Sequence, residues 1–254
     1  MKPAQEFGVS DQARDVREMF AAVARRYDLL NHLLSAGLDR RWRSRAAAAC
    51  IRALQQQSGR GAGASPLVLD LCSGTGDLAA AILRRLPTGR VIACDFCGPM
   101  LILAREKFAR ANLAGRTAIV EADALALPLP DGSVDAVTCA FGLRNLADRQ
   151  RGPEEMIRVL APGGPVVILE FHRPRGQGAL ARALGLYFRR ILPRLGAWIS
   201  GGDHGGYQYL VASIEAFGPM EGVTEALRDA GLRDVRAEPL TGGIVSVFVG
   251  FKPR

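Results

Sequence analysis

The 254-residue sequence lacks the features that would place it in a membrane or outside the cell. No stretch approaches the ~20 consecutive apolar residues that a membrane-spanning helix needs. The first residues, MKPAQEFGVSDQARD, contain no apolar signal core, so we expect a cytoplasmic protein. The five cysteines are an odd number spread along a mid-sized chain, which suits a reducing compartment and does not resemble a disulfide framework.

The sequence also has few residues arranged as metal ligands. The histidines are scattered, at His32, His172 and His204. Cys94 and Cys97 form a C-x-x-C pair, but the second closely spaced pair of a four-thiolate zinc site is missing. We therefore predict no metal and interpret the cysteines as small packing residues.

Composition and charge indicate a folded domain with anionic partners. The chain is 48% hydrophobic and 23% charged, as in ordinary globular proteins, and its length suits one large α/β domain with a helical appendage. The net charge of +8 comes almost entirely from arginine, with six arginines in residues 25–45 and four in 181–200. This excess favours nucleic acid, acidic substrates or an anionic membrane surface as partners.

Apolar spacing predicts helices first and alternating strands and helices afterwards. Residues 16–30 repeat apolar positions at helical spacing, and residues 41–57 are rich in helix formers. We divide the chain into a helical lid (1–57), a linker (58–65) and an α/β domain (66–254), with a substrate-cap insertion at about 175–220. The predicted strands span 66–71, 90–96, 117–123, 133–141 and 165–171, and the helices between them span 76–86, 98–113 and 153–160.

The order of these elements predicts the fold. Strands that alternate with helices form a parallel, doubly wound sheet. Near the C-terminus, strands at 233–239 and 244–252 are joined by a short link at LTGG. They must pair antiparallel, because a parallel return needs a longer crossover. The predicted fold is therefore α/β, with a mostly parallel sheet that ends in an antiparallel hairpin.

A glycine-rich turn, in DLCSGTGDLA, follows the first predicted strand. Gly74, Gly76 and Ala79 satisfy the dinucleotide fingerprint G-x-G-x-x-G/A, so NAD is one candidate ligand. Asp70 before the turn and Asp77 after it oppose NAD, because a pyrophosphate would meet like charge there. A ligand that carries an ammonium would instead be attracted.

Acidic residues also end the next two predicted strands. Asp95 lies nineteen residues after Gly76, where an acid can bind both hydroxyls of a ribose. Asp123, beside Ala124, is placed to accept a hydrogen bond from an adenine amine. Acids at the carboxyl ends of three successive strands outline a nucleoside that carries positive charge. We predict S-adenosylmethionine, which has both an ammonium and a sulfonium, as the cofactor.

Longer motifs carry a closer resemblance. The chain contains, in order, MFAAVARRYDLLNHLLSAGLDRRWR, VLDLCSGTGDLA, DFCGPML, AFGLRNLAD, IRVLAPGG, ILEF, GYQYLVASIEAF and LTGGIVSVFVGFK. Over residues 16 to 252 it resembles the C-methyltransferases of ubiquinone and menaquinone biosynthesis. The resemblance implies a class I S-adenosylmethionine-dependent methyltransferase with a Rossmann-like fold and a seven-stranded sheet. It also implies methylation of a ring carbon of a polyprenylated quinol, and leaves open the choice between benzoquinol and naphthoquinol.

The same resemblance assigns cofactor residues. By match to the family's motifs, Thr75, Asp95, Asp123 and Ala124 are expected to contact S-adenosylmethionine. The remaining predicted cofactor residues are Asp70, Gly74, Gly76, Phe96 and Ala140. At position 140 the family often has serine, so the alanine removes one hydrogen bond near the cofactor.

The motif AFGLRN begins where the fourth predicted strand ends, at the expected ligand crevice of an open α/β sheet. We hypothesise that Arg144 stabilises the quinolate or orients a water that accepts its proton, and that Asn145 fixes ring oxygens. The alternative is that both residues only hold the loop. Tyr27 and Asp28, on the predicted lid, would close over the ring or simply pack there. The predicted substrate residues are Asp203, Tyr207, Tyr209 and His172.

The quinol substrate implied by the resemblance carries an isoprenoid tail and resides in the bilayer. Residues 181–200 mix large apolar side chains with four arginines, as a helix in a membrane interface would. We expect peripheral contact with the inner face of an anionic membrane; the alternative is a lid helix packed on the core. Nucleic acid is not expected as a partner, and a homodimer is left open.

Three other functions compete with this one. A methyltransferase for another lipophilic molecule, such as a sterol or phenol, would share the cofactor turn, but FGLRN and LTGGIV favour the quinol. An RNA-binding protein would explain the positive charge, but the sequence shows no aromatic-plus-basic RNA motif. A dinucleotide oxidoreductase is opposed by the acids around the glycine turn.

Overall fold

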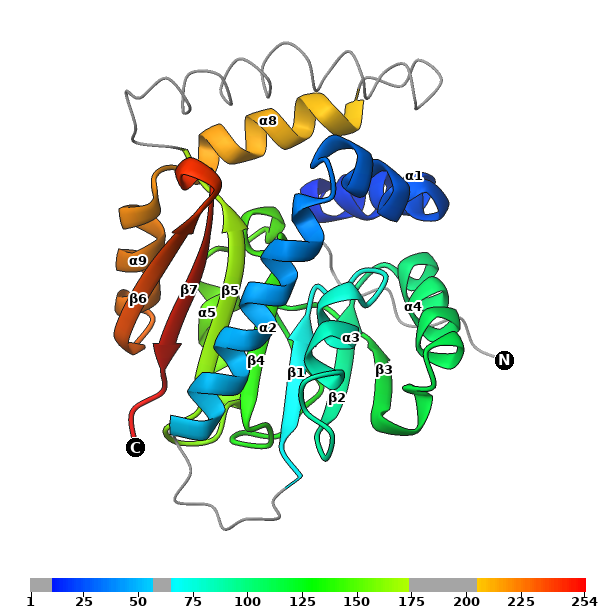
Figure 1. Cartoon of the computed structure of the whole chain (residues 1–254). Coiled ribbons are helices and arrows are strands. Elements are labelled where there is room, and N and C mark those ends of the chain that lie inside the picture. Colours follow the sequence, from blue (N-terminus) through cyan, green and yellow to red (C-terminus); the bar gives the residue numbers. More distant parts are fainter. Residues whose placement is uncertain (1–10, 57–64, 174–204) are drawn as a thin grey trace.

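A computed structural model describes residues 11–56, 65–173 and 205–254 of the chain. Within these residues, helices cover both faces of one seven-stranded sheet (Figure 1). The strand order is β3-β2-β1-β4-β5-β7-β6. The strands are β1 (Leu67–Leu71), β2 (Arg90–Asp95), β3 (Thr117–Glu121), β4 (Ala136–Ala140), β5 (Pro165–Phe171), β6 (Arg233–Leu240) and β7 (Val245–Phe251).

The sheet has the predicted topology. The strands β1 to β5 pair in parallel, and β7 runs antiparallel to both of its neighbours, β5 and β6. The prediction of a mostly parallel sheet with a C-terminal antiparallel hairpin is therefore confirmed. β2 lies on one side of β1 and β4 on the other, so the strand order reverses at β1. Open α/β sheets bind ligands at the carboxyl ends of the strands beside such a reversal.

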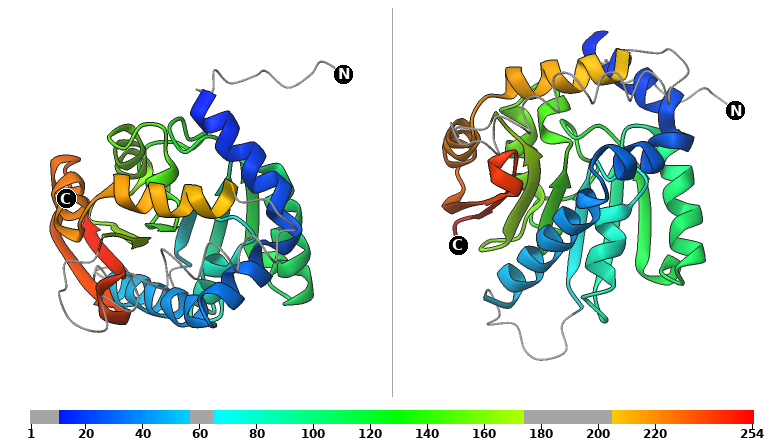
Figure 2. Two further views of the ribbon diagram at one scale, coloured as in Figure 1. Left: turned by 90° about the horizontal axis from the view of Figure 1, so that it is seen from above. Right: turned by 45° about the horizontal axis from the view of Figure 1, so that its top comes forward.

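The helices form two layers and a cover. α2, α3 and α4 pack on one face of the sheet, and α5 and α9 pack on the other. α1 and α8 lie across the end of the molecule to which the parallel strands point (Figures 1 and 2). The helices are α1 (Asp11–Leu34), α2 (Leu38–Gln56), α3 (Asp77–Leu83), α4 (Gly98–Arg110), α5 (Arg151–Val159), α8 (Gly205–Phe217) and α9 (Met220–Asp229).

α2 packs on the sheet although it lies within the predicted lid. Its alanine-rich face lets the helix approach the sheet closely, and Trp42, Ala46 and Cys50 are buried there. The Trp42 indole N–H donates a hydrogen bond of 2.8 Å to the hydroxyl of Thr241, in the link between β6 and β7. Of the two N-terminal helices, α1 alone lies over the strand ends. The predicted domain boundary at the linker stays a prediction, because residues 57–64 lie outside the described residues.

Glycine and proline shape the strand-to-helix turns beside the crevice. Gly76, which precedes α3, has a φ of 81°, and a Cβ there would lie 2.4 Å from Cζ of Phe108. The turn after β1 therefore needs glycine at this position. α4 begins at Gly98 and Pro99, where the fixed φ of proline favours a helix start.

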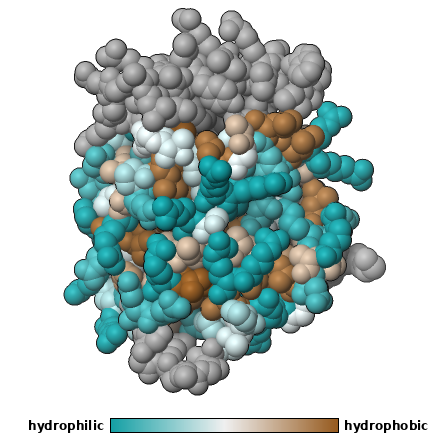
Figure 3. Space-filling view, in the orientation of Figure 1, coloured by the Kyte–Doolittle hydropathy of each residue, from teal (hydrophilic) through white to brown (hydrophobic). Residues whose placement is uncertain are grey.

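The surface combines polar areas with a few exposed hydrophobic side chains. Hydrophilic side chains cover much of the face in Figure 3, with hydrophobic areas among them, one at the top where α1 runs. Leu29 and Leu33 on α1 and Ile102 on α4 are exposed. Among the described helices, none is both long and apolar enough to cross a membrane. The predicted interfacial segment, 181–200, lies outside the described residues.

Candidate functional site

A pocket lies at the carboxyl ends of the parallel strands, where the strand order predicts a ligand site. α1 contributes Ala13, Phe20 and Tyr27 to its wall, and Met100 comes from α4. The remaining wall comes from the segments that follow β1, β2, β3 and β4. The predicted cofactor residues that line this pocket are Gly74, Asp95, Phe96, Asp123, Ala124 and Ala140. Their contact with the cofactor stays a prediction that this placement supports.

Asp95 joins two of these segments and faces the pocket. Its Oδ2 accepts a hydrogen bond from the Gly74 N–H at 2.8 Å, and its Oδ1 accepts one from the Cys97 N–H at 2.9 Å. Burial raises the pKa of Asp95, although the backbone N–H groups act in the opposite direction. Because each carboxylate oxygen can accept a second hydrogen bond, Asp95 keeps the capacity to bind two vicinal hydroxyls.

Asp70 lies in the core, although we predicted it at the cofactor. It is 1% exposed, and its Oδ1 accepts a hydrogen bond of 2.7 Å from the Thr138 hydroxyl on the neighbouring strand β4. Burial raises its pKa from 3.8 to about 7, although the hydrogen bond from Thr138 lowers it. Asp70 is not among the residues that line the pocket, so the geometry supports no direct contact with the cofactor.

Thr75 and Asp77, on the glycine turn, contact the predicted lid residue Asp28 and Lys107 of α4. The Thr75 hydroxyl donates to Asp28 Oδ1 at 2.6 Å. Lys107 Nζ donates to Asp28 Oδ2 at 2.7 Å, to the Thr75 hydroxyl at 3.0 Å, and to Asp77. None of these four residues is among the pocket-lining residues. Asp77, which we expected to attract the ligand's ammonium, is paired with an ammonium of the chain itself.

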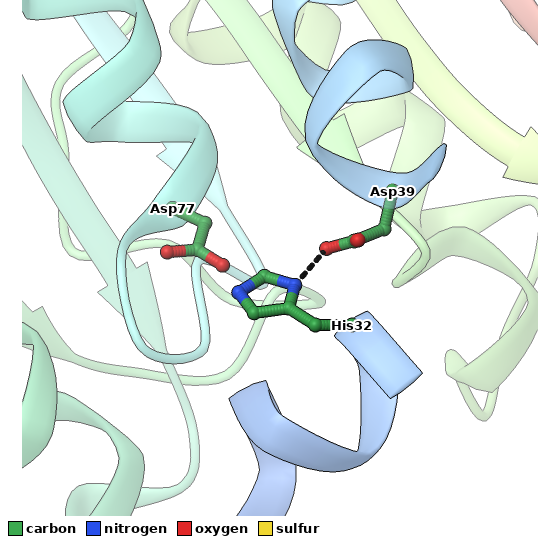
Figure 4. Close-up of side chains that lie close together, drawn as sticks. All are labelled: His32, Asp39 and Asp77. Carbon is green, nitrogen blue, oxygen red and sulfur yellow. Dashed lines mark hydrogen bonds and ion pairs between the residues drawn. The ribbon is translucent and has the colours of Figure 1, made fainter. Parts of the chain in front are cut away.

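His32, Asp39 and Asp77 approach one another from α1, α2 and α3 (Figure 4). Their ligand atoms lie within 4.8 Å of one another, as in a metal site, and His32 Nδ1 lies 2.7 Å from Asp39 Oδ2. The same oxygen accepts from Arg43 Nη1 at 2.6 Å, while Lys107 pairs with Asp77. Cationic side chains of the chain therefore already neutralise both acids, and the cluster fits an ion-pair network better than a metal site.

Arg144, the predicted catalytic residue of AFGLRN, is buried at 7% exposure. Its Nη1 pairs with Glu170 Oε1 at 2.6 Å and also donates to the Phe141 carbonyl at 2.7 Å. Its Nε donates to the Ser213 hydroxyl on α8 at 3.2 Å. These contacts tie the turn after β4 to the end of β5 and to α8, and Arg144 is not among the pocket-lining residues.

Asn145 and Tyr27 line the pocket, whereas Tyr209 and His172, two of the predicted substrate residues, are not among its lining residues. Asn145 Oδ1 accepts a hydrogen bond of 3.2 Å from the Tyr209 hydroxyl on α8. Burial raises the pKa of Tyr209, so its hydroxyl keeps its proton near neutral pH. Asp203 lies outside the described residues. Tyr207 lies in the first turn of α8, and its side chain is outside what the structure describes.

His172 is a core residue in this structure. It is 3% exposed, and its Nε2 lies 2.8 Å from the hydroxyl of the buried Ser246 on β7. Burial lowers the pKa of His172, so the ring is neutral at physiological pH. It is not among the pocket-lining residues, and its geometry supports packing more than contact with a substrate.

Two charged residues of the site were missed in the sequence. Glu170 neutralises Arg144, and its only local signal was an acid at the end of an otherwise apolar strand. Lys107 holds the acids of the glycine turn and of α1. It is one of three lysines in a chain whose other cationic side chains are arginines, which was a usable signal.

Comparisons with known proteins agree with this geometry. The profile of the ubiE/COQ5 methyltransferase family matches residues 8–252. A demethylmenaquinone methyltransferase of Thermus thermophilus is 47% identical over 92% of this chain and 100% of its own length. The ubiquinone/menaquinone biosynthesis C-methyltransferase UbiE of Geobacter sulfurreducens is 40% identical over 97% of this chain and 91% of its own. A SAM-dependent methyltransferase from Aquifex aeolicus shares the fold, with a TM-score of 0.52 at 21% identity over 79% of this chain and 86% of that one.

Proposed function

The chain belongs to the ubiE/COQ5 methyltransferase family and is an S-adenosylmethionine-dependent methyltransferase, and from this premise we propose that it methylates a ring carbon of a polyprenylated quinol. The observation that carries the proposal is the 47% identity along the whole length of a demethylmenaquinone methyltransferase. It favours demethylmenaquinol as the substrate. The benzoquinol of ubiquinone synthesis is the second candidate, since other relatives are named for both pathways.

The pocket suits the cofactor chemically. Asp95 and Asp123 supply carboxylates for hydroxyl and amine groups, and Gly74 lets the ligand approach the backbone closely. Phe96, Met100 and other apolar side chains of the pocket can hold the flat base. When bound, S-adenosylmethionine supplies a methyl group on a positively charged sulfur, which a carbon nucleophile accepts.

A hydroquinol offers such a carbon once a ring hydroxyl loses its proton, because the phenolate charge is shared with the ortho carbon. The methylated carbon then loses its hydrogen as a proton, which restores the aromatic quinol. The protein must therefore align the ring and help to remove or stabilise that proton. We assign the ring oxygens to Asn145, whose side chain lines the pocket and is held by Tyr209 and by the Phe141 carbonyl. Tyr27 covers the ring from α1.

The contacts of Arg144 favour a positioning role. Its guanidinium is held by Glu170, Ser213 and the Phe141 carbonyl, so it fixes the turn that presents Asn145 to the pocket. A guanidinium is also too basic to accept the quinol proton itself. Arg144 then acts on turnover through the placement of Asn145, or through a water that it orients.

The assay that tests the function uses purified protein, methyl-labelled S-adenosylmethionine and reduced demethylmenaquinol, with the benzoquinol counterpart in parallel. We expect label on a ring carbon of the quinol. Arg144→Lys should lower kcat at least ~10-fold and change the Kd for S-adenosylmethionine less than ~2-fold, because the turn moves while the cofactor residues stay. Transfer to oxygen, or no transfer to either quinol, would refute the function. Equal losses in kcat and cofactor affinity would refute the assignment of Arg144.

We further propose cytoplasmic residence with peripheral membrane contact, and the described part of the chain offers a surface for it on α1. Leu29 and Leu33 are 56% and 51% exposed on its outward face, next to the exposed Arg25 and Arg26. Figure 3 shows a hydrophobic area at the top of the molecule, where α1 runs in Figure 1. Apolar side chains flanked by arginine suit the interface of an anionic bilayer. Since the same helix lines the pocket with Tyr27, a lipophilic quinol would have a short path from the bilayer.

Co-sedimentation with phosphatidylglycerol vesicles tests this contact. The wild type should bind at low salt, and Leu29→Glu/Leu33→Glu should abolish binding. Ile102→Glu, which changes a side chain 62% exposed on α4, is the matched control and should bind as the wild type does. No binding by the wild type at low salt would reject the contact. A dimer in light scattering that the double substitution splits would show that a second copy covers this face instead.

A further inference from the structure

Four polar side chains fasten α1 to the glycine turn, and we call them the latch: Asp28 on α1, Thr75 and Asp77 on the turn and at the start of α3, and Lys107 on α4. Asp28 accepts from the Thr75 hydroxyl at 2.6 Å and from Lys107 at 2.7 Å. Lys107 also bonds to Thr75 and Asp77. Hydrogen bonds in which both partners are charged are the stronger kind, and the latch contains two of them.

Lys107 is the centre of the latch because it lies between two carboxylates. Its side chain is 23% exposed, and those of Asp28 and Asp77 are 34% and 24% exposed. These pairs are therefore screened less than ordinary surface pairs. Burial raises the pKa of Asp77, but Lys107, Arg43 and His32 together outweigh that effect, so the pKa lies below its ordinary value. Without the ammonium, two carboxylates would face each other.

Other contacts among the described residues also hold α1 in place over the pocket. Phe20, Ala24 and Tyr27 join a small apolar cluster with Cys97 and Met100. The pair of Arg17 with Glu121 is half exposed, at 48% and 51%, and such pairs contribute little. Among the described residues, the latch is therefore one of the main polar attachments of α1, beside this cluster, the network of His32 and Asp39, and the buried Val16 and Leu30.

The latch residues do not line the pocket and would affect the ligand only through Tyr27. Asp28 adjoins Tyr27, which lines the pocket, while Lys107 itself is not a lining residue. We propose that Lys107 is a positioning residue that holds α1 closed over the bound cofactor and sets the rate at which the cofactor leaves. When the latch opens, α1 loses its charged contacts with the glycine turn and α4, Tyr27 and Phe20 are held less firmly against the pocket, and the closed state becomes less populated. The inference concerns cofactor exchange and holds whichever quinol is the substrate.

Lys107→Met tests the proposal, because methionine keeps much of the apolar stem and removes the charge. Radiolabelled S-adenosylmethionine is bound to the full chain without quinol, excess unlabelled cofactor is added, and the loss of label is followed by rapid filtration. We expect the dissociation rate to rise at least ~10-fold, which corresponds to about 1.4 kcal/mol. Arg110→Met is the matched control, since it removes one cation from the same helix at a side chain 74% exposed, and it should leave the rate unchanged.

Two further variants separate latch opening from general damage. Asp28→Asn added to Lys107→Met removes the facing charges and should bring the rate back towards the wild type. Thr75→Val deletes the 2.6 Å hydrogen bond to Asp28 and the 3.0 Å one from Lys107, but keeps the ion pairs of Lys107 with Asp28 and Asp77. It should raise the rate by a smaller factor, which keeps the proposal testable if Lys107→Met does not fold. A rate within two-fold of the wild type in Lys107→Met, or in Thr75→Val if the former is unfolded, overturns the proposal. So does an equal rise in Arg110→Met.

Discussion

Asp70 offers a quantitative test of the electrostatics beneath the site. Its carboxyl is 1% exposed at the end of β1, and burial raises its pKa from 3.8 to about 7. Asp70→Asn replaces this acid by an amide of the same shape, and the amide oxygen can still accept the 2.7 Å hydrogen bond from Thr138. The substitution therefore removes the titration and keeps the principal contact.

The pKa shift of Asp70 gives the sign and the size of its effect on the free energy of unfolding. Below pH 3.8 both the folded and the unfolded chain hold the proton, and between pH 4 and 7 only the folded chain holds it. The free energy of unfolding of the wild type therefore loses about 1.4 kcal/mol per pH unit from this group, until the loss ends above pH 7. The total loss is about 4 kcal/mol, which Asp70→Asn does not suffer. In Asp70→Asn the buried amide hydrogens lack acceptors, which lowers the free energy of unfolding by about 1–3 kcal/mol at every pH.

Urea unfolding of the cofactor-free protein at half-unit steps from pH 4.5 to 8 measures the difference between the variant and the wild type. Asp70→Asn should be less stable than the wild type at pH 4.5 and should gain on it steadily as the pH rises to 7.5. Asp148→Asn provides a flat control, because the backbone N–H groups of Arg151 and Gln150 lower the pKa of Asp148 below its ordinary value of 3.8. The stabilising effect of Asp148 is lost only as the pH falls through that lowered pKa, below this range, so the difference between Asp148→Asn and the wild type should stay constant from pH 4.5 to 8. A difference between Asp70→Asn and the wild type that stays constant across the range would refute a raised pKa for Asp70.

Two further substitutions test the contacts that shape the site. Glu170→Gln leaves the Arg144 guanidinium buried without its counter-charge, and should lower the free energy of unfolding by about 3–5 kcal/mol in urea titrations; a loss under ~1 kcal/mol would contradict this. Gly76→Ala should lower the melting temperature and weaken cofactor binding in calorimetry, because the new Cβ would lie 2.4 Å from Phe108 and φ is 81°. Gly115→Ala, where a Cβ meets open space, should change neither.

The fold could be predicted from the sequence because its signals are local. The strands of the parallel sheet are short, mostly apolar runs, helical patterns follow the first, second and fourth of them, and the LTGG link allows only an antiparallel return. α8 was not predicted, because it lies across the strand ends and is not part of the strand–helix alternation. Asp95 and Asp123 could be placed at the pocket because the ends of parallel strands converge.

The rest of the site depends on contacts between distant segments. Asp70 pairs in register with Thr138 and points to the same face as the core residue Val68, since side chains two apart on a strand share a face. A strand pattern alone did not show that this face is covered by α2 and α3. Lys107 meets Asp28 across 79 positions of the chain, and its role follows only from the packing of α1 beside α4.

The packing of α2 against the last part of the chain has a consequence for folding during translation. Trp42 and the alanines of α2 are buried against α3, β5 and β7, and Trp42 bonds to Thr241. This helix is translated early and meets α3 soon afterwards, but β7 and Thr241 become available only when synthesis is nearly finished. Until then the part of its apolar face that packs on β7 is open to solvent or to a chaperone on the ribosome. Nascent chains that stop short of β7 should therefore be bound by chaperones or degraded, because α2 still lacks the strand that covers part of its apolar face.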